Sequence, residues 1–431
     1  MLYRLVRPLA ALGIKANYQH IFLSNVDRIP KDKPVILAAN HPTAFIEPCI
    51  LACFLDRPLY FLVRGDFFAK PIFSFLLRLL NMLPVFRMRD GGFTKLKNNY
   101  ATFDACSKAL KANKTIMILA EGRTMHEKRL RPIQKGTARI AMVALERFPD
   151  LEEIYIIPVG VNYTYAEQSR TTVMIDFGEP LRARDYLEHY QEKPTLAIEQ
   201  LTADLSQALA DRVVIIEKEA SEELTEYLLR LHRAENPLPL FPIIKSQSEP
   251  LFAEKQIADM VNGFDLEKRQ SLEASAKQYF DQLAQSGLVD ETVVDPRPYA
   301  LFTFIFLFLG FFPFLIGYSW NFIPLRIAKY LADTRVKHIT FYAPVKLALG
   351  IGTYLVWTLI WGAILFINEW YWGFLWLSLA GLLGHFSLYY QEYYQKYSQH
   401  RRWKNLNDAL KNEIMAARKH LKKKIPRQLT V

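Results

Sequence analysis

The sequence predicts an α/β domain, in which helices cover a sheet, followed by a helical region and a C-terminal helical membrane domain. Three observations support this prediction. Short apolar runs alternate with helical patterns up to about residue 215. A proline-containing polar stretch follows them. From residue 299 onward there are three uncharged apolar segments of 21 or 22 residues, and about 20 such residues suffice to cross a bilayer.

Residues 1–30 are predicted to form an amphipathic N-terminal segment. Leucines alternate with basic residues along its first half. This pattern fits either a surface helix that touches a membrane or a helix packed on its own domain. Arg7 and Pro8 interrupt the first apolar run, so the segment does not resemble a signal peptide.

Residues 31–215 are predicted to be the α/β domain. Its expected strands are continuous apolar runs, typical of a sheet buried on both faces, and they lie at 35–40, 59–64, 115–121, 154–163 and 171–177. Helical patterns fall between them, at 48–54, 67–80, 93–113 and 135–147. Pro158 lies inside the fourth run and is expected to mark a bulge or a strand end.

The helical linker region is predicted at residues 216–298. A single or interrupted helix is expected at 195–234, with a proline-rich linker at 236–250 and a polar helix at 251–286. Little else in this region indicates a function.

The membrane domain is predicted at residues 299–390. Its first segment, 299–320, is expected to span the bilayer or to re-enter it, and residues 347–390 are expected to form a hairpin turning at Asn368–Glu369. Gly310, Pro313 and Gly317 are where the first segment could bend or break. A re-entrant segment would leave the basic stretches on both sides of the hairpin in the cytoplasm, as the positive-inside rule requires.

The charge of the chain is concentrated in its basic C-terminal tail, residues 391–431. The net charge is +11, and residues 396–427 hold eleven Lys and Arg against two acids. Beside apolar segments, such a tail predicts binding to anionic lipid headgroups. No nucleic-acid-binding motif accompanies it, so nucleic acid is not expected as a partner. Three cysteines exclude a disulfide framework.

The stretch NHPTAFIEP follows one predicted strand and precedes a helix. His41 is therefore expected just beyond the carboxyl end of a strand, where open α/β sheets place their ligands. Glu47, six residues later, completes a histidine–carboxylate combination of the kind that acts as a general base. The alternative is a buried histidine that is satisfied by its neighbours.

A second polar stretch follows another predicted strand. Glu121 and Gly122 form a tight exit from that strand, and basic residues, among them Arg123, then cluster. Lys135 and Gly136 open a helix whose N-terminal amides favour an anion, and arginine suits bidentate contact with phosphate. A solvated basic loop is the alternative.

In order and spacing, these motifs resemble the glycerolipid acyltransferase family, which includes glycerol-3-phosphate and 1-acylglycerol-3-phosphate acyltransferases. The family pattern has a histidine followed by an acid, an arginine-bearing block, a glutamate–glycine block and a proline. The matching residues lie within about 30–180: His41 with Glu47, Arg87 in PVFRMRD, Glu121-Gly122 with Lys135-Gly136, and Pro158.

The sequence departs from the common family pattern in two ways. Five residues instead of four separate the histidine from the acid, and the acid is Glu47 rather than an aspartate. The third block reads EGRTMHEKRLRPIQKG and lacks the common Gly-Thr-Arg order. Both features resemble the branch that includes fungal glycerol-3-phosphate acyltransferases, and they leave the acceptor open.

The resemblance implies an O-acyltransferase of phospholipid synthesis that moves a fatty acyl group from a thioester to glycerol-3-phosphate or its 1-acyl derivative. It implies His41 as general base, oriented by Glu47. The implied substrate-binding residues are Arg87, Glu121, Gly122, Arg123, Lys135 and Gly136. The acyl donor would be acyl-coenzyme A or acyl carrier protein, with no further cofactor and no metal.

The enzyme would be an integral membrane protein with its catalytic domain on the cytoplasmic face. Its partners would be membrane lipid and a phosphorylated glycerol. Two alternatives remain: another acceptor, such as dihydroxyacetone phosphate or an amino-lipid, or a catalytically inactive membrane scaffold.

Overall fold

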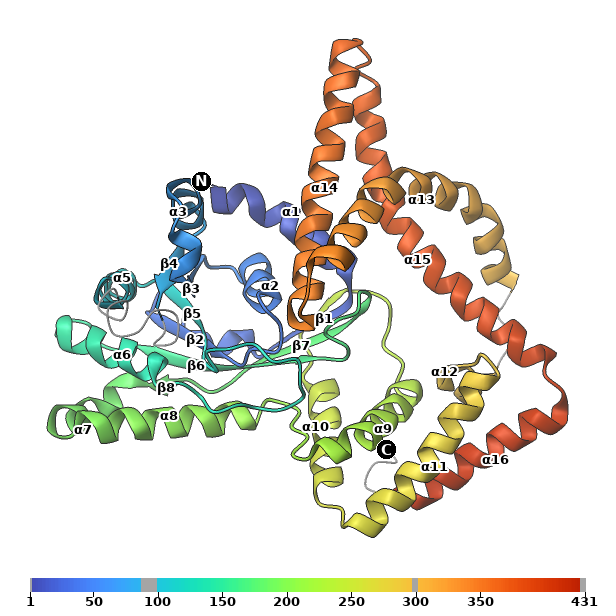
Figure 1. Ribbon diagram of the computed structural model, residues 1–431, viewed down its shortest axis with the longest axis horizontal. Helices are drawn as coiled ribbons and strands as arrows, with labels where there is room; N and C mark the ends of the chain where they lie inside the picture. Colours follow the sequence, from blue (N-terminus) through green and yellow to red (C-terminus); the bar gives the residue numbers. More distant parts are fainter. Residues whose placement is uncertain (1, 87–98, 297–300, 427–431) are drawn as a thin grey trace. The chain divides into compact units, whose positions relative to one another are not determined.

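The computed structural model describes residues 2–86, 99–296 and 301–426, which form two compact units. The first unit comprises the described residues up to 215 together with 240–252 and 335–348. The second comprises the described residues of 216–239, 253–334 and 349–431. The first unit is therefore assembled from three separate stretches of the chain (Figure 1).

The first unit is built on one mixed sheet. Its main path follows the order β4-β3-β5-β2-β6-β7-β1-β9, and β8 pairs with β6. The five strands from β4 to β6 are parallel, whereas β7 runs antiparallel to β6 and parallel to β1. The strands are β1 (Tyr18–Ser24), β2 (Val35–Ala39), β3 (Leu59–Arg64), β4 (Met82–Val85), β5 (Thr115–Leu119), β6 (Tyr155–Tyr163), β7 (Thr171–Phe177), β8 (Leu181–Arg182) and β9 (Ile244–Lys245).

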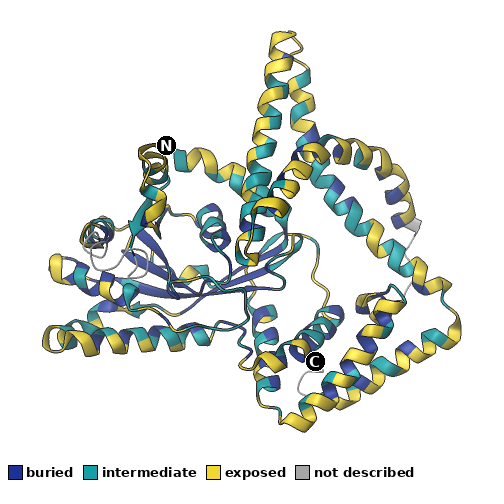
Figure 2. Ribbon diagram, in the orientation of Figure 1, coloured by how far each residue is buried: buried dark blue, intermediate teal, exposed yellow. Residues whose placement is uncertain are grey.

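Helices cover both faces of this sheet, which is the buried layer in Figure 2. One face packs against α1 (Leu2–Asn17), α2 (Ile46–Phe54) and the first turns of α14 (Ile339–Ile367). The other face packs against α5 (Asn99–Lys111), α6 (Gly136–Arg147) and α8 (Pro194–Ala210), with α7 (Leu187–Glu192) at its side. Because side chains alternate along a strand, Val35 and Leu37 of β2 face the first group of helices, and Ile36 faces the second.

The predicted fold class is confirmed, and five of the nine described strands coincide closely with predicted runs. The sheet also uses residues that were not predicted to be strands. Strand β1 lies inside the predicted N-terminal segment, and β9 lies inside the predicted linker and pairs with β1. Residues 195–234 form two helices, α8 and α9 (Glu222–Glu235), so the interrupted alternative is the correct one.

The prediction that Pro158 marks a bulge or strand end was wrong. Pro158 lies inside the nine-residue strand β6, opposite Ala38 of β2. On the other side of β6, the partner changes at this point, from β8 at Tyr155–Ile156 to β7 from Val159 onward. A residue without an N–H group is tolerated there because the missing donor falls between two ladders.

The second unit is helical. It contains α9, most of α10 (Glu249–Asn262), α11 (Leu266–Gln285), α12 (Asp290–Val294), α13 (Leu301–Arg335), the rest of α14, α15 (Gly373–Asn405) and α16 (Asp408–Lys424). The turn between α14 and α15 includes Asn368 and Glu369, as predicted for the hairpin. Two helices in the described part of the chain are long and apolar enough to cross a membrane, Thr303–Arg335 and Ile339–Ile367.

Helix α13 continues unbroken through Gly310, Pro313 and Gly317, and it curves along its length (Figure 1). The glycines permit close packing on α15: a Cβ atom built on Gly317 would lie 2.2 Å from the carbonyl oxygen of Leu383. The side chain of Asn321 further along α13 donates to the carbonyl of Ala380 at 3.1 Å. Re-entry of this segment into the membrane stays a prediction.

Candidate active site

His41 and Glu121 leave the same edge of the sheet from neighbouring strands. Strands β2 and β5 are parallel, with Ala39 opposite Leu119, and the amide of Ala120 still donates to the carbonyl of Ala39 at 2.7 Å. Each of the two residues lies two positions beyond this last pair, so the register places them side by side. His41 is 6% exposed and Glu121 is 5% exposed. A histidine and a carboxyl group thus share a buried site at the carboxyl edge of parallel strands.

Asn40 fixes the backbone immediately before His41. Its side-chain amide donates to the carbonyl of Val161 at 2.9 Å, and its side-chain oxygen accepts from the Val161 amide at 2.7 Å. Both bonds are buried and join the residue that follows β2 to strand β6. This double contact was not predicted, because an asparagine at a strand end is more often a turn residue.

Glu47 is completely buried in the first turn of α2. Its Oε1 accepts from the backbone amide of Thr43 at 2.6 Å, and the Thr43 hydroxyl accepts from the amide of Ile46 at 3.3 Å. These contacts close the loop between His41 and the helix. Burial raises the pKa of Glu47 to about 8, although the contacts from Thr43 oppose the rise. The predicted pairing of Glu47 with His41 stays a prediction.

Glu121 holds the basic loop that follows β5. Its Oε1 accepts from the amide of Arg131 at 3.4 Å, and the carbonyl of His41 accepts from the amide of Met125 at 3.3 Å. Burial raises the pKa of Glu121 to about 7, against the opposing effect of the backbone amides of Arg131 and His41. The site therefore contains two carboxyl groups that titrate well above their ordinary range.

Two predicted glycines differ in what they do. Gly122 has a φ of +70°, and a Cβ atom there would lie 2.9 Å from Cγ of Gln134. The turn after Glu121 therefore requires glycine. Gly136, the first residue of α6, has no atom within 4 Å of a built Cβ position, so its backbone faces open space.

The predicted phosphate-binding residues lie in different settings. Arg123 is exposed just after the turn at Gly122. Lys135 is only partly exposed, and its ammonium group contacts Oε1 of Glu199 on α8 at 2.7 Å. Arg87 lies outside the described residues. Within 2–86, 99–296 and 301–426, no cluster of three or more His, Cys, Asp or Glu side chains could hold a metal ion.

Two buried tyrosines, Tyr18 of β1 and Tyr163 of β6, lie near Glu47 and were not predicted as site residues. Their ring centroids are 6.1 Å apart. Burial raises the pKa of both phenols, and the charge of Glu47 adds to the rise. Tyr18 was missed because its segment looked like part of a surface helix, and Tyr163 because it ends an apolar run.

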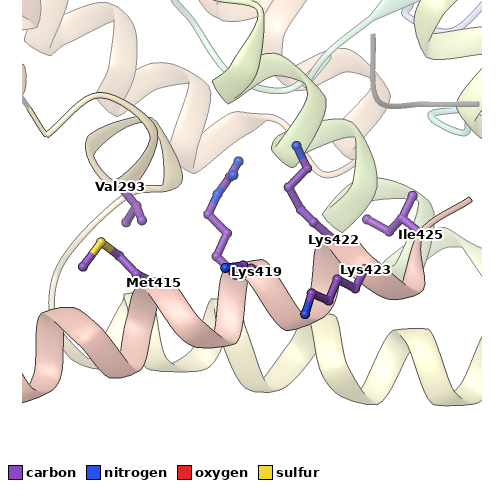
Figure 3. A pocket seen from close by; sticks show the side chains of 7 residues that line it. Val293, Met415, Lys419, Lys422, Lys423 and Ile425 are labelled. Carbon is purple, nitrogen blue, oxygen red and sulfur yellow. The ribbon is translucent and has the colours of Figure 1, made fainter. Parts of the chain in front are cut away.

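Residues 391–424 of the basic C-terminal tail lie mainly in the end of α15 and in α16, which packs on α11. Arg418 contacts Asp290 at 2.8 and 3.0 Å and Glu235 at 3.0 Å, so part of the positive charge is neutralised inside the unit. A cavity of about 550 Å³ opens beside α16, lined by Val293, Met415, Arg418, Lys419, Lys422, Lys423 and Ile425 (Figure 3). Binding of this tail to anionic headgroups stays a prediction.

Residues 20–162 match the family model described as acyltransferase. The chain is 26% identical over 135 residues to glycerol-3-phosphate O-acyltransferase 1 of Saccharomyces cerevisiae, and 25% identical over 113 residues to glycerol-3-phosphate O-acyltransferase 2 of the same yeast. These matches cover 30% and 26% of this chain, but only 18% and 15% of the yeast proteins. The likeness to the yeast enzymes is therefore confined to a small part of their length.

One solved structure with similarity is the 1-acyl-sn-glycerophosphate acyltransferase PlsC from Thermotoga maritima. Its sequence identity to this chain is 16% and the TM-score is 0.33. The alignment covers 47% of this chain and 80% of PlsC.

Proposed function

We propose that the chain transfers a fatty acyl group from a thioester to a hydroxyl of a phosphorylated glycerol, and the premise is that residues 20–162 match the acyltransferase family model and resemble part of the yeast glycerol-3-phosphate O-acyltransferases. The observation that carries the proposal is the register of β2 and β5, which brings His41 and Glu121 together in a buried site. Glycerol-3-phosphate is the favoured acceptor, because both yeast relatives are named for it.

In the proposed reaction, the imidazole of His41 takes the proton from the acceptor hydroxyl. The hydroxyl oxygen attacks the thioester carbonyl, a C–O bond forms, and the C–S bond breaks. The proton then passes from the imidazolium to the departing thiolate. Since the attacking oxygen belongs to the acceptor, the reaction needs no acyl-enzyme intermediate. The donor is acyl-coenzyme A or an acyl carrier protein.

The two carboxyl groups receive different roles in this proposal. Glu47 has a pKa of about 8, so it is largely protonated at neutral pH and offers little negative charge to an imidazolium. Its bond to Thr43 supports a positioning role, in which Glu47 holds the loop that carries His41. Glu121 accepts from the amide of Arg131, which supports a role in ordering the basic loop.

The acceptor phosphate is assigned to the basic loop after β5. Arg123 is exposed two residues after Glu121, and an exposed guanidinium is suited to bidentate contact with phosphate. Lys135 would have to give up its contact with Glu199 to contribute. We therefore rank Arg123 ahead of Lys135, and retain Arg87 as a candidate from the sequence.

Membrane attachment is part of the proposal, because the acylated product belongs in lipid. Among the described residues, two helices are apolar and long enough to cross a bilayer. The first turns of α14 belong to the first unit, where the carbonyl of Thr340 accepts from the amide of Ala44 in the His41 loop at 3.2 Å. The positive-inside rule favours the cytoplasmic face for the catalytic unit.

The test is thiol release from acyl-coenzyme A by the full chain in detergent, with glycerol-3-phosphate or 1-acylglycerol-3-phosphate as acceptor. We expect release that requires an acceptor and that falls by roughly 10²–10⁴ in His41→Ala, the usual contribution of a general base. The matched control is His420→Ala, at an exposed position on α16, which should retain full activity.

If His41→Ala releases thiol at the wild-type rate, His41 is not the base. If neither acceptor supports release, the assay is repeated with acyl carrier protein as donor and with dihydroxyacetone phosphate and an amino-lipid as acceptors. Absence of transfer in every combination would favour the inactive scaffold.

A further inference from the structure

Helix α3 (Pro71–Leu79) exposes apolar side chains around most of its circumference. None of its nine residues is buried, and Figure 2 shows this helix largely in the colour of exposed residues. Ile72 is 67% exposed and Phe75 is 63% exposed. The exposed large side chains here are Phe67, Ile72, Phe73, Phe75, Leu76 and Leu79. Contiguous apolar surface of this kind marks an interaction site in a soluble domain.

The charges around this apolar surface are almost all positive. Arg64, Lys70 and Arg78 lie along it, and the acid within the segment, Asp66, is bound by Arg64 at 2.7 Å. The guanidinium of Arg64 lies 5.9 Å from the ring of Phe67, and that of Arg78 lies 5.9 Å from the ring of Phe68. An apolar centre with a cationic margin is the pattern of an element that lies in the interface of a membrane with anionic lipid.

The length of α3 decides between lying in a membrane and crossing it. Nine residues extend about 14 Å, less than half of the roughly 30 Å of hydrocarbon in a bilayer. Helix α3 is therefore too short to span. It can bury its apolar side chains only by lying along the boundary between headgroups and acyl chains.

The position of α3 in the fold relates it to the candidate active site. A short 3-10 helix, η2 (Gly65–Phe68), and then α3 follow the carboxyl end of β3. Strand β3 is parallel to β5, and Glu121 lies two residues beyond the end of β5. The apolar helix and the polar site therefore both begin at the same edge of the sheet.

The bilayer is favoured over a second protein copy because this unit is already connected to an apolar helix. Ala343 of α14 is buried in the core of the first unit, and Leu347 packs against that core. The uncharged run of α14 begins at the same Leu347 and continues to Ile367. The last residues of the first unit therefore lie within one helical turn of an apolar segment that is suited to the hydrocarbon core of a bilayer.

We propose that η2 and α3 form an interfacial docking element that inserts its apolar side chains into a membrane surface. The element keeps the edge of the sheet that carries His41 and Glu121 next to the lipid. The proposal concerns where the domain lies, and it stands or falls independently of the reaction.

The test uses the full chain reconstituted in vesicles of phosphatidylcholine and phosphatidylglycerol. An environment-sensitive fluorophore is attached at Phe75→Cys, in a background where Cys49, Cys53 and Cys106 are replaced by alanine. Lipids that carry a nitroxide high on the acyl chain serve as quenchers. The matched control is Leu196→Cys, because Leu196 is an exposed leucine on α8, which covers the other face of the sheet.

We expect a blue-shifted emission at position 75 that the nitroxide quenches, because the side chain lies at the boundary between headgroups and acyl chains. The probe at position 196 should show neither effect. Identical, water-like behaviour at the two positions would overturn the proposal. So would a blue shift at position 75 that grows with protein density and ignores the nitroxide, because it would indicate contact with a second copy.

Discussion

Two features that arise at one edge of the sheet reverse the usual distribution of polar and apolar groups. In the His41 and Glu121 loops, ionisable side chains are buried. In α3, large apolar side chains are exposed. Folding alone gains from neither arrangement, since burial of a carboxyl group and exposure of an aromatic ring both cost free energy. The first suits a small polar acceptor held inside protein, and the second suits contact with lipid.

The largest effect on stability is expected from Glu47, a buried carboxyl group on the polar side of this comparison. Its pKa of about 8 lies above that of the unfolded chain, so the folded state holds its proton more tightly. Stability should therefore fall as pH rises between about 4.5 and 8, by up to roughly 5 kcal/mol. In Glu47→Gln this pH dependence of stability should disappear, except for the contribution of Glu121 below about pH 7. Denaturation in detergent at several pH values measures how the free energy of unfolding of each protein depends on pH. If Glu47→Gln shows the same pH dependence as the wild type, Glu47 does not hold its proton more tightly in the folded state.

Asn40→Ala tests whether the sheet edge that carries His41 and Glu121 depends on the hydrogen bonds between Asn40 and β6. Two buried hydrogen bonds to Val161 are lost, so we expect roughly 2–4 kcal/mol of destabilisation. Asn162→Ala is the matched control, because Asn162 makes the same double contact with Arg212 and Val214. Both variants should lose similar stability, but only Asn40→Ala should also lower kcat. Equal kcat values would argue that Asn40 is purely structural.

Gly122→Ala tests whether the turn after Glu121 requires a glycine. The positive φ alone should cost roughly 1–2 kcal/mol with any side chain, and the new Cβ also crowds Gln134. Gly136→Ala provides the control, since nothing lies near its built Cβ. It should change stability by less than about 0.5 kcal/mol. Melting curves of both variants in the same detergent measure the difference, and equal losses would contradict the assigned roles.

The smallest effect on stability is expected in α3. Phe75→Ser removes a large apolar side chain that the protein does not bury, so stability should change by less than about 0.5 kcal/mol. The control is Ile50→Ala in the core of the first unit, which should cost roughly 2–5 kcal/mol. A large loss in Phe75→Ser, measured in detergent, would show that α3 is part of the core.

The sequence was sufficient to predict the fold class and the strands that carry His41 and Glu121, because buried parallel strands read as continuous apolar runs. Strand β9 could not be predicted, since two residues inside a proline-rich stretch carry no periodic signal. Strand β1 was hidden because residues 18–24 follow an amphipathic helix without a turn signal between them.

Within the candidate site, residue types were easier to predict than contacts. The histidine, the carboxyl groups and the glycines were all identifiable from motifs at strand ends. Their register was not, because it depends on which strands are neighbours in the sheet. The contact between Lys135 and Glu199 joins residues 64 positions apart, and the bond between Asn40 and Val161 spans 121 positions. No local sequence pattern predicts contacts between residues so far apart in the chain.

The division of the first unit among three stretches of chain has a consequence for its synthesis. The core is complete only when residues 335–348 have been made, because Ala343 is part of it. Residues 301–334 of the apolar helix α13 precede this stretch, so they leave the ribosome before it does. Translation thus delivers a candidate membrane helix before the first unit can finish folding. A chain truncated after residue 215 would lack β9 and the start of α14, and would therefore lack part of the first unit.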